Sequence, residues 1–174
     1  VELPIVWIEV QAERGRVLEV GNVLGGYYPI QHDVLDKYDA SPTVIHADAA
    51  HWKPTQRYGL IVSISTIEHI GREDLPYAFD VYKPLAALYN LLWNALADGG
   101  RMLITLPRGY SQPIDTLADG GDFPFAWVSY LAQVSPGVWR EASFDEVRWM
   151  QYGHPYAHAS AVMIGQINAR PPRL

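Results

Sequence analysis

The feature that most constrains this chain is a short apolar strand that stops at an acidic residue and then turns on glycines. It occupies residues 16–26, with the sequence RVLEVGNVLGG, and its acidic residue is Glu19. A second strand-like run stops at another acid, Asp36, 17 residues after Glu19. Glycines let a backbone approach a ligand closely, and a carboxylate at the next strand tip accepts hydrogen bonds from ribose hydroxyls. This arrangement indicates a site for an adenosine-containing small molecule at the end of a parallel sheet.

Composition places the chain among globular proteins and disfavours several kinds of partner. Hydrophobic residues make up 49% of its 174 residues and charged residues 18%, which suits one domain with a single core. The net charge of −6 disfavours nucleic acid, which usually needs a basic face. The absence of cysteine excludes disulfides and thiol nucleophiles. The sequence has no signal peptide and no apolar run that could cross a bilayer, and so predicts a cytoplasmic protein with no membrane partner.

Alternating strand-like and helix-like segments predict a mostly parallel sheet. Helices are expected over residues 1–12 and 84–97, and a turn with at most a very short helix over 21–28. The strands of this half are expected at 16–20, 32–35, 44–47, 58–65 and 102–106. The order strand–helix–strand favours parallel strands joined by right-handed crossovers.

After residue 110 the pattern changes to shorter strand-like runs separated by Gly/Pro turns. These runs span residues 125–134, 138–140, 147–152 and 160–167. At least two of them are expected to complete the sheet at one edge, as an antiparallel pair. The proline-rich end, residues 170–173, is expected to be a frayed tail.

Five segments together resemble the class I S-adenosylmethionine-dependent methyltransferases, over about residues 16–167. They are VLEVG at 17–21, LD at 35–36, ADA at 47–49, SISTIEHI at 63–70 and LADGGRML at 96–103. Any single segment is a weak signal, but all five occur in the family's order at the expected strand ends. The resemblance implies an α/β fold, a Rossmann-like class I methyltransferase sandwich with a mostly parallel central sheet and an antiparallel C-terminal strand pair.

The resemblance also implies how the chain is organised and what it binds. Residues 1–174 would form one domain, with an N-terminal helix at 1–15, a cofactor-binding half at 16–107 and a strand-rich substrate-side half at 108–170. The cofactor would be S-adenosylmethionine, with S-adenosylhomocysteine as its product. Asp36 would hold the ribose and Asp48 the adenine amino group. The implied cofactor-binding residues are Glu19, Gly21, Asn22, Gly25, Asp36, Lys37, Asp48, Ala49 and Ser65.

The glycine turn departs from the family pattern in two ways. The family's turn usually reads G-x-G-x-G, and Val23 stands here at the position of the central glycine. The helix after the turn is also unusually short. In addition, Gly59 stands where an acid often precedes the fourth strand. These departures leave open how the methionine end of the cofactor is held.

Each acidic candidate also has a plainer structural explanation. Glu19 either faces the cofactor crevice or pairs with Arg14 or Arg16, because an unpaired carboxylate is costly to bury. Asp36 is either the ribose ligand or an exposed turn acid. Asp48 is likewise either a ligand of the base or a turn acid before two alanines.

Glu68 and His69 are the catalytic candidates, because they follow the fourth expected strand, where an open α/β sheet has its crevice. Histidine can take a proton from an oxygen or nitrogen nucleophile near neutral pH. The alternative is that Glu68 caps a helix and His69 packs on the rim. The histidines show no metal-ligand pattern, so no metal is expected. Candidates for the lining of a substrate pocket are Arg108, Tyr110, Tyr152, His154 and Tyr156.

The function that the resemblance implies is methyl transfer to an oxygen or nitrogen atom of a small molecule. A fainter resemblance, to small bacterial methyltransferases found beside glycan-synthesis genes, points to a sugar or other small-molecule acceptor. One alternative is a non-catalytic binding module that keeps the fold. A second is an NAD-dependent oxidoreductase, which the missing G-x-G-x-x-G spacing disfavours.

Overall fold

The computed structural model describes residues 1–72 and 80–169, within which one sheet contains eight strands. The strands are β1 Val17–Val20, β2 Asp33–Leu35, β3 Val44–Ile45, β4 Tyr58–Ile64, β5 Leu96–Pro107, β6 Trp127–Ser135, β7 Val138–Ala142 and β8 Ala161–Asn168. Their order across the sheet is β3-β2-β1-β4-β5-β8-β6-β7. The first five strands in this order pair in parallel, and β8, β6 and β7 continue the sheet with antiparallel pairings. The expected α/β fold class is therefore confirmed.

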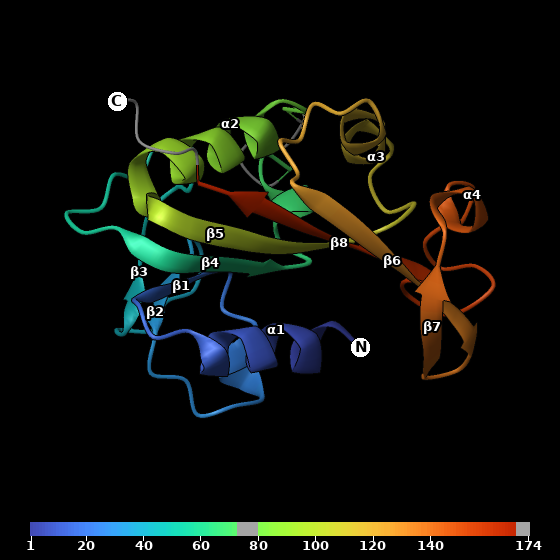
Figure 1. The fold of residues 1–174 in the computed structure, drawn as a ribbon, viewed down its shortest axis with the longest axis horizontal. Coiled ribbons are helices and arrows are strands. Elements are labelled where there is room, and N and C mark those ends of the chain that lie inside the picture. The colour runs from blue at the N-terminus through green and yellow to red at the C-terminus, as the bar shows by residue number, and fades with distance from the viewer. Residues whose placement is uncertain (73–79, 170–174) are drawn as a thin grey trace.

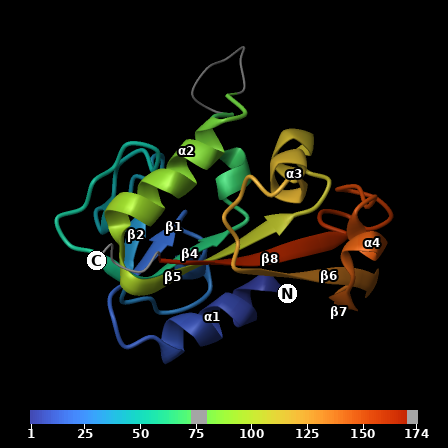
Figure 2. The same cartoon turned by 45° about the horizontal axis from the view of Figure 1, so that its top comes forward.

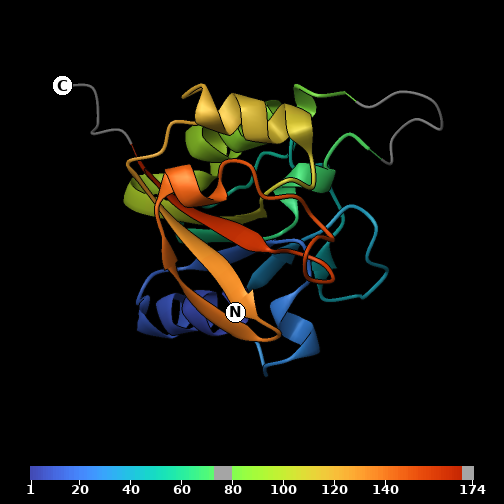
Figure 3. The same ribbon diagram turned by 90° about the vertical axis from the view of Figure 1, so that its right-hand side faces the viewer.

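Helices cover both faces of the sheet (Figures 1 and 2). Helix α1, Glu2–Ala12, lies on one face, and α2, Lys83–Asn90, and α3, Gln112–Asp119, lie on the other. Figure 3 shows the same two-sided arrangement from the side of the β6–β7 hairpin. The shorter helical segments are η1 Leu24–Gly26, η2 Ile67–His69, η3 Leu91–Ala95 and α4 Phe144–Val147. Among the described residues, no helix has both the length and the apolar character needed to span a membrane.

Strand β4 shows why the central strands are apolar on both sides. Leu60 and Val62 pack in a core cluster with Val6 and Val10 of α1. Ile61, between them, packs in the cluster on the opposite face, which includes Leu88 of α2. Successive side chains of a strand point to opposite faces, so a strand covered on both sides is almost continuously hydrophobic.

Most of the expected elements are found, with shifted ends. The expected helix over 84–97 begins one residue earlier and finishes with the π-helical segment η3, after which β5 starts at once. In the turn over 21–28, the only helix is the short η1, as expected. The predicted frayed tail at 170–173 lies outside the described residues.

One predicted strand is wrong, and two helices, α3 and α4, were not predicted. Residues 147–152 form no strand: the segment begins at the end of α4 and continues as turns, with only an isolated bridge at Gln151. Ser143 and Glu146 form a capping box that starts α4. Helix α3 carries a proline in its first turn, a position where proline is well tolerated, and this signal could have located it.

Candidate functional site

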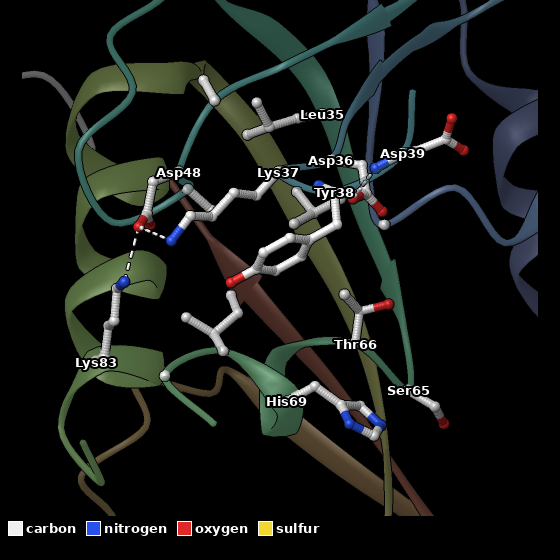
Figure 4. A pocket seen from close by; sticks show the side chains of 16 residues that line it. Leu35, Asp36, Lys37, Tyr38, Asp39, Asp48, Ser65, Thr66, His69 and Lys83 are labelled. Carbon is white, nitrogen blue, oxygen red and sulfur yellow. Dashed lines mark hydrogen bonds and ion pairs between the residues drawn. The ribbon is translucent and has the colours of Figure 1, made fainter. Parts of the chain in front are cut away.

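A cavity of about 350 Å³ opens at the carboxyl ends of β1, β2, β3 and β4 (Figure 4). This is the edge where open α/β sheets bind ligands. Seven of the residues expected to bind cofactor or act in catalysis line it, namely Gly21, Asp36, Lys37, Asp48, Ala49, Ser65 and His69. Within the described part of the chain, Glu19, Asn22, Gly25 and Glu68 do not line it. Tyr38, Thr66 and Lys83 line it and were not anticipated as site residues.

Gly21 is required by the geometry of the turn after β1. Its φ is 87°, a conformation that L side chains rarely adopt. A Cβ at this position would overlap the side chain of Thr66, which follows β4. The backbone N–H of Gly21 donates to the carbonyl of Leu35 at 2.9 Å, which ties the turn to the end of β2. Glycine therefore lets the backbones of three strand ends meet at the cavity wall.

Glu19 stabilises the glycine turn through hydrogen bonds and does not line the cavity. Its side chain is fully buried, and Oε1 accepts hydrogen bonds from the backbone N–H groups of Val23 and Leu24 at 2.9 and 2.7 Å. Oε2 lies 2.9 Å from Nε2 of His32. Among the described residues, His32 is the basic side chain that contacts it; Arg16, one of the two partners considered from the sequence, pairs instead with Asp33. The buried carboxylate is thus hydrogen-bonded throughout.

Val23 fits the turn without strain. Its φ is −97°, an ordinary value for a branched residue, and its side chain packs beside the core cluster that contains Val6 and Leu24. The backbone at position 23 therefore does not need the conformational freedom of glycine. The departure from the family pattern is accommodated by packing on the α1 face.

Asp36 is held rigidly at the tip of β2. One of its carboxylate oxygens accepts from the backbone N–H groups of Tyr38 and Asp39 at 2.8 and 3.0 Å, and the other accepts from Asn22 N at 3.2 Å. Asp39 in turn accepts from the Asn22 side chain at 2.6 Å and from Ser41 N at 2.7 Å. Hydrogen bonds from Ser41 and Asn22 lower the pKa of Asp39 to about 2. Asn22 thus connects the glycine turn to the loop that contains Asp36 and Asp39.

Asp48 forms the opposite end of the cavity, where two lysines meet its carboxylate (Figure 4). One oxygen, Oδ2, lies 2.7 Å from Nζ of Lys83 and 3.3 Å from Nζ of Lys37. The other oxygen accepts from Ala50 N at 3.0 Å. Burial opposes ionisation of Asp48, but the hydrogen bonds from Lys83, Ala50 and Lys37 outweigh it and lower the pKa to about 2. Asp48 is therefore ionised throughout the neutral range.

Ser65, which follows β4, adopts a positive φ of 43°. Its hydroxyl donates to Oε1 of Glu2, in the first turn of α1, at 2.6 Å, and Thr105 Oγ1 donates to the same oxygen at 2.6 Å. The backbone N–H of Ser65 donates to the carbonyl of Thr105 at 3.1 Å. These bonds hold the strained residue in place. Glu2, which accepts both hydrogen bonds, carries no local sequence signal that would have selected it.

The two catalytic candidates differ in accessibility. His69 lines the cavity with a side chain that is 43% exposed, and its Nδ1 lies 3.3 Å from the hydroxyl of Tyr110. Glu68 is 1% exposed, and its carboxylate has no hydrogen-bond partner in any other described residue. Burial raises the pKa of Glu68 to about 8. Its Oε1 lies 3.9 Å from Nε2 of His69, beyond hydrogen-bond distance.

Aromatic rings from distant segments gather beside His69. The rings of His69 and Tyr110 have centroids 4.9 Å apart, and Tyr110 packs edge-on against Tyr152, also at 4.9 Å. Two of the five residues expected to line a substrate pocket therefore meet at one place. His154 and Tyr156 shape the neighbouring loop through their backbones, both of which bond the hydroxyl of Ser160.

Arg108 has a structural position instead of the expected place in a substrate pocket. It is 2% exposed, and its guanidinium pairs with Asp119 at 2.8 and 2.9 Å and with Asp115 at 3.1 Å. The carboxylates belong to α3, so the arginine fixes that helix to the end of β5. These two acids bind Nη1 and Nη2, whereas Nε has no hydrogen-bond partner among the described residues. Separately, among residues 1–72 and 80–169, no group of three His, Cys, Asp or Glu side chains is placed to hold a metal ion.

Several solved structures share this architecture at low sequence identity. NodS, an N-methyltransferase from Bradyrhizobium japonicum WM9 in complex with S-adenosyl-L-homocysteine, matches with a TM-score of 0.56 and 12% identity over 98% of this chain and 85% of its own. A SAM-dependent methyltransferase from Thermotoga maritima, described as a possible histamine N-methyltransferase, matches with a TM-score of 0.55 and 12% identity over 97% and 89%. A TehB-like SAM-dependent methyltransferase from Corynebacterium glutamicum matches with a TM-score of 0.50 and 20% identity over 94% and 85%.

These likenesses identify the fold. The chain has the class I fold of S-adenosylmethionine-dependent methyltransferases, as the sequence resemblance implied. No protein-family model and no curated protein matches the sequence. The likeness of this chain to known proteins is therefore a likeness of fold.

Proposed function

We propose that the cavity binds S-adenosylmethionine and that the chain transfers its methyl group to an oxygen or nitrogen atom of a small molecule. The observation that carries this proposal is the single cavity wall formed by Gly21, Asp36 and Asp48 at the ends of three adjacent parallel strands. A cavity of about 350 Å³ is within the usual range for small-molecule sites. A side chain at Gly21 would overlap that of Thr66, which also lines the cavity.

The order of the strands suggests how the residues would share the ligand. Gly21 and Ser65, at β1 and β4, would hold the methionine part. Asp36, on the neighbouring β2, would accept hydrogen bonds from the ribose, and Asp48 and Ala49, beyond β3, would lie beside the base. Three backbone donors already fix the Asp36 carboxylate, so it is oriented before any ligand arrives.

The chemistry requires alignment more than charge stabilisation. S-adenosylmethionine supplies a sulfonium methyl, which leaves a neutral thioether when the acceptor lone pair forms the new bond. Positioning of the two reactants can lower the barrier by about 7–11 kcal/mol at best. The acceptor must also lose a proton, and His69 is the cavity-lining group suited to take it. Glu68, buried beside the imidazole, would act by positioning His69.

A nitrogen acceptor with a ring is the class we favour for the first screen. Tyr110 and Tyr152 present aromatic rings next to His69, and such rings pack well against sugar or aromatic faces. NodS is described as an N-methyltransferase, and the Thermotoga protein as a possible histamine N-methyltransferase. A sugar amine satisfies both observations, and a sugar hydroxyl is the next candidate.

Calorimetric titration with S-adenosylhomocysteine tests the cofactor assignment. We expect micromolar binding by the natural chain and at least tenfold weaker binding by Asp36→Ala, because about 1.4 kcal/mol of hydrogen bonding to ribose is lost. Asp145→Ala, which removes an exposed carboxylate on α4, is the matched control. Thermal unfolding of each variant shows that the fold is kept.

The result can contradict the proposal in two ways. Equal affinity of Asp36→Ala and the natural chain would remove Asp36 from the ribose site. Preference for NAD in a parallel titration would replace S-adenosylmethionine as the cofactor.

A further inference from the structure

Glu2 lies in the first turn of α1 and reaches the ends of two central strands. Val6 and Val10, further along the helix, pack in a core cluster with residues of β4 and β5. Residues spaced by four share one face of a helix, so this packing directs Glu2 toward the same two strands. Its Oε1 accepts from the hydroxyls of Ser65 and Thr105, both at 2.6 Å, near the carboxyl ends of β4 and β5.

The side chain of Ser65 is used for this contact with α1. A serine hydroxyl has one proton to donate, and Ser65 donates its proton to Glu2. In Figure 4 this hydroxyl points away from the other labelled side chains of the cavity. The side chain therefore anchors Ser65 to α1, and this anchor sets where the backbone of Ser65 lies at the edge of the cavity that it lines.

The backbone of Ser65 depends on such an anchor because it is strained. Its φ of 43° falls in the left-handed region, which favours glycine and is costly for a residue with a Cβ. A strained residue keeps its conformation where the surrounding contacts hold it. Here the N–H of Ser65 donates to the carbonyl of Thr105 at 3.1 Å, while the side chains of both residues donate to Glu2.

A shift of Ser65 would pass directly to the wall of the cavity. Thr66 is the next residue and lines the cavity. Its side chain occupies the space that a Cβ of Gly21 would take, so Thr66 and Gly21 lie close together. The connection from Glu2 to the cavity wall therefore runs through Ser65 to Thr66 and then to Gly21.

We infer that Glu2 is a positioning residue for the cofactor, and that it acts by holding the strained backbone of Ser65. This hold keeps Thr66 and Gly21 where the cavity needs them. The inference rests on the proposed function, because it assumes that S-adenosylmethionine occupies the cavity. It adds α1 to the machinery of the site, although Glu2 is not one of the residues that line the cavity.

Calorimetric titration with S-adenosylhomocysteine tests the inference in two variants of Glu2. Glu2→Ala removes the acceptor, so Ser65 can relax, and we expect about tenfold weaker binding than in the natural chain. Glu2→Gln keeps an oxygen that can accept from both hydroxyls, and its affinity should stay within about threefold. Glu9→Ala is the matched control, because it removes a carboxylate of the same helix that pairs with Arg101, and it should leave the affinity unchanged.

A glycine at position 65 separates positioning from a general structural role. Glycine adopts a positive φ without strain, so Ser65→Gly should bind the ligand and should no longer need Glu2. In that background we expect Glu2→Ala to change the affinity by less than about twofold. Thermal unfolding of each variant shows that the chain is folded at the temperature of the titration.

Several results would overturn the inference while the natural chain still binds the ligand, and would leave the proposed function intact. Glu2→Ala could bind as tightly as the natural chain, or Glu2→Gln as weakly as Glu2→Ala. The loss on Glu2→Ala could persist in the Ser65→Gly background, or Ser65→Gly alone could abolish binding. A natural chain that does not bind S-adenosylhomocysteine would overturn the proposed function and the inference together.

Discussion

The half of the cavity that we propose for the cofactor and the half that we propose for the acceptor differ in how completely nearby buried carboxylates are hydrogen-bonded. At the ends of β1, β2 and β3, the carboxylates of Glu19, Asp36 and Asp48 each accept two or more hydrogen bonds. Beside η2, the buried carboxylate of Glu68 has no hydrogen-bond partner in any other described residue. The first half is organised in advance, whereas the second half keeps a buried group available.

This difference matches the demands of the two ligands. A cofactor is always the same molecule, so a rigid set of hydrogen bonds suits it. The acceptor must be positioned and also lose a proton, so a group with unused bonding capacity is useful there. Unsatisfied buried groups lower stability, and Glu68 is the buried carboxylate that has no hydrogen-bond partner among the described residues. The comparison therefore supports a reactive role for the η2 side.

The largest expected effect is the pH dependence of stability caused by Glu68. Its folded pKa of about 8 lies above the ordinary value of 4.5. Between these values the unfolded chain binds fewer protons than the folded one, so the free energy of unfolding falls as pH rises. A shift of this size corresponds to about 5 kcal/mol over the window, as an upper bound.

Chemical denaturation of the natural chain and of Glu68→Gln between pH 5 and pH 8 measures how the free energy of unfolding depends on pH. The variant cannot ionise at this position, so its stability should stay nearly level while that of the natural chain declines. Parallel curves for the two proteins would mean that Glu68 titrates normally and that the η2 side is as well bonded as the cofactor side.

Glu19→Ala should cause the next largest loss, about 3 kcal/mol of unfolding free energy. The substitution leaves the backbone N–H groups of Val23 and Leu24 without their acceptor, and each buried orphan costs about 1–3 kcal/mol. The midpoint of chemical denaturation measures this loss of stability. Glu141→Ala, which removes an exposed carboxylate, is the control. A loss below about 1 kcal/mol would show that the glycine turn does not depend on its buried carboxylate.

The sequence carried strong local signals for the cofactor side. Strand ends, glycines and acids mark the cavity wall at Gly21, Asp36 and Asp48, because each signal lies within a few residues of its effect. Glu2 and Lys83 escaped notice, since they act on Ser65 and Asp48 across long stretches of chain. The position of Arg108 was misjudged for the same reason: the acids that bind it belong to a helix the sequence analysis missed.

Gly21→Ala should lower affinity for S-adenosylhomocysteine by about thirtyfold, or about 2 kcal/mol. The new Cβ strains a residue at φ 87° and overlaps Thr66, which moves two walls of the cavity apart. Gly26→Ala is the matched control, because no described atom lies within 4 Å of its Cβ position. Calorimetry on both variants measures the effect, and equal affinities would show that the turn is more adaptable than its contacts suggest.

His69→Ala should have the smallest effect, about a tenfold loss of turnover with unchanged affinity for S-adenosylhomocysteine. Alignment supplies most of the rate enhancement in methyl transfer, and removal of a proton supplies the smaller share when the acceptor is a nitrogen. The measurement is turnover with whichever ring amine the screen identifies, and His46→Ala, at an exposed histidine beyond β3, is the control. A matching loss of ligand affinity would place His69 in the cofactor half. Full turnover would show that His69 takes no part in the mechanism and that η2 contributes only to packing.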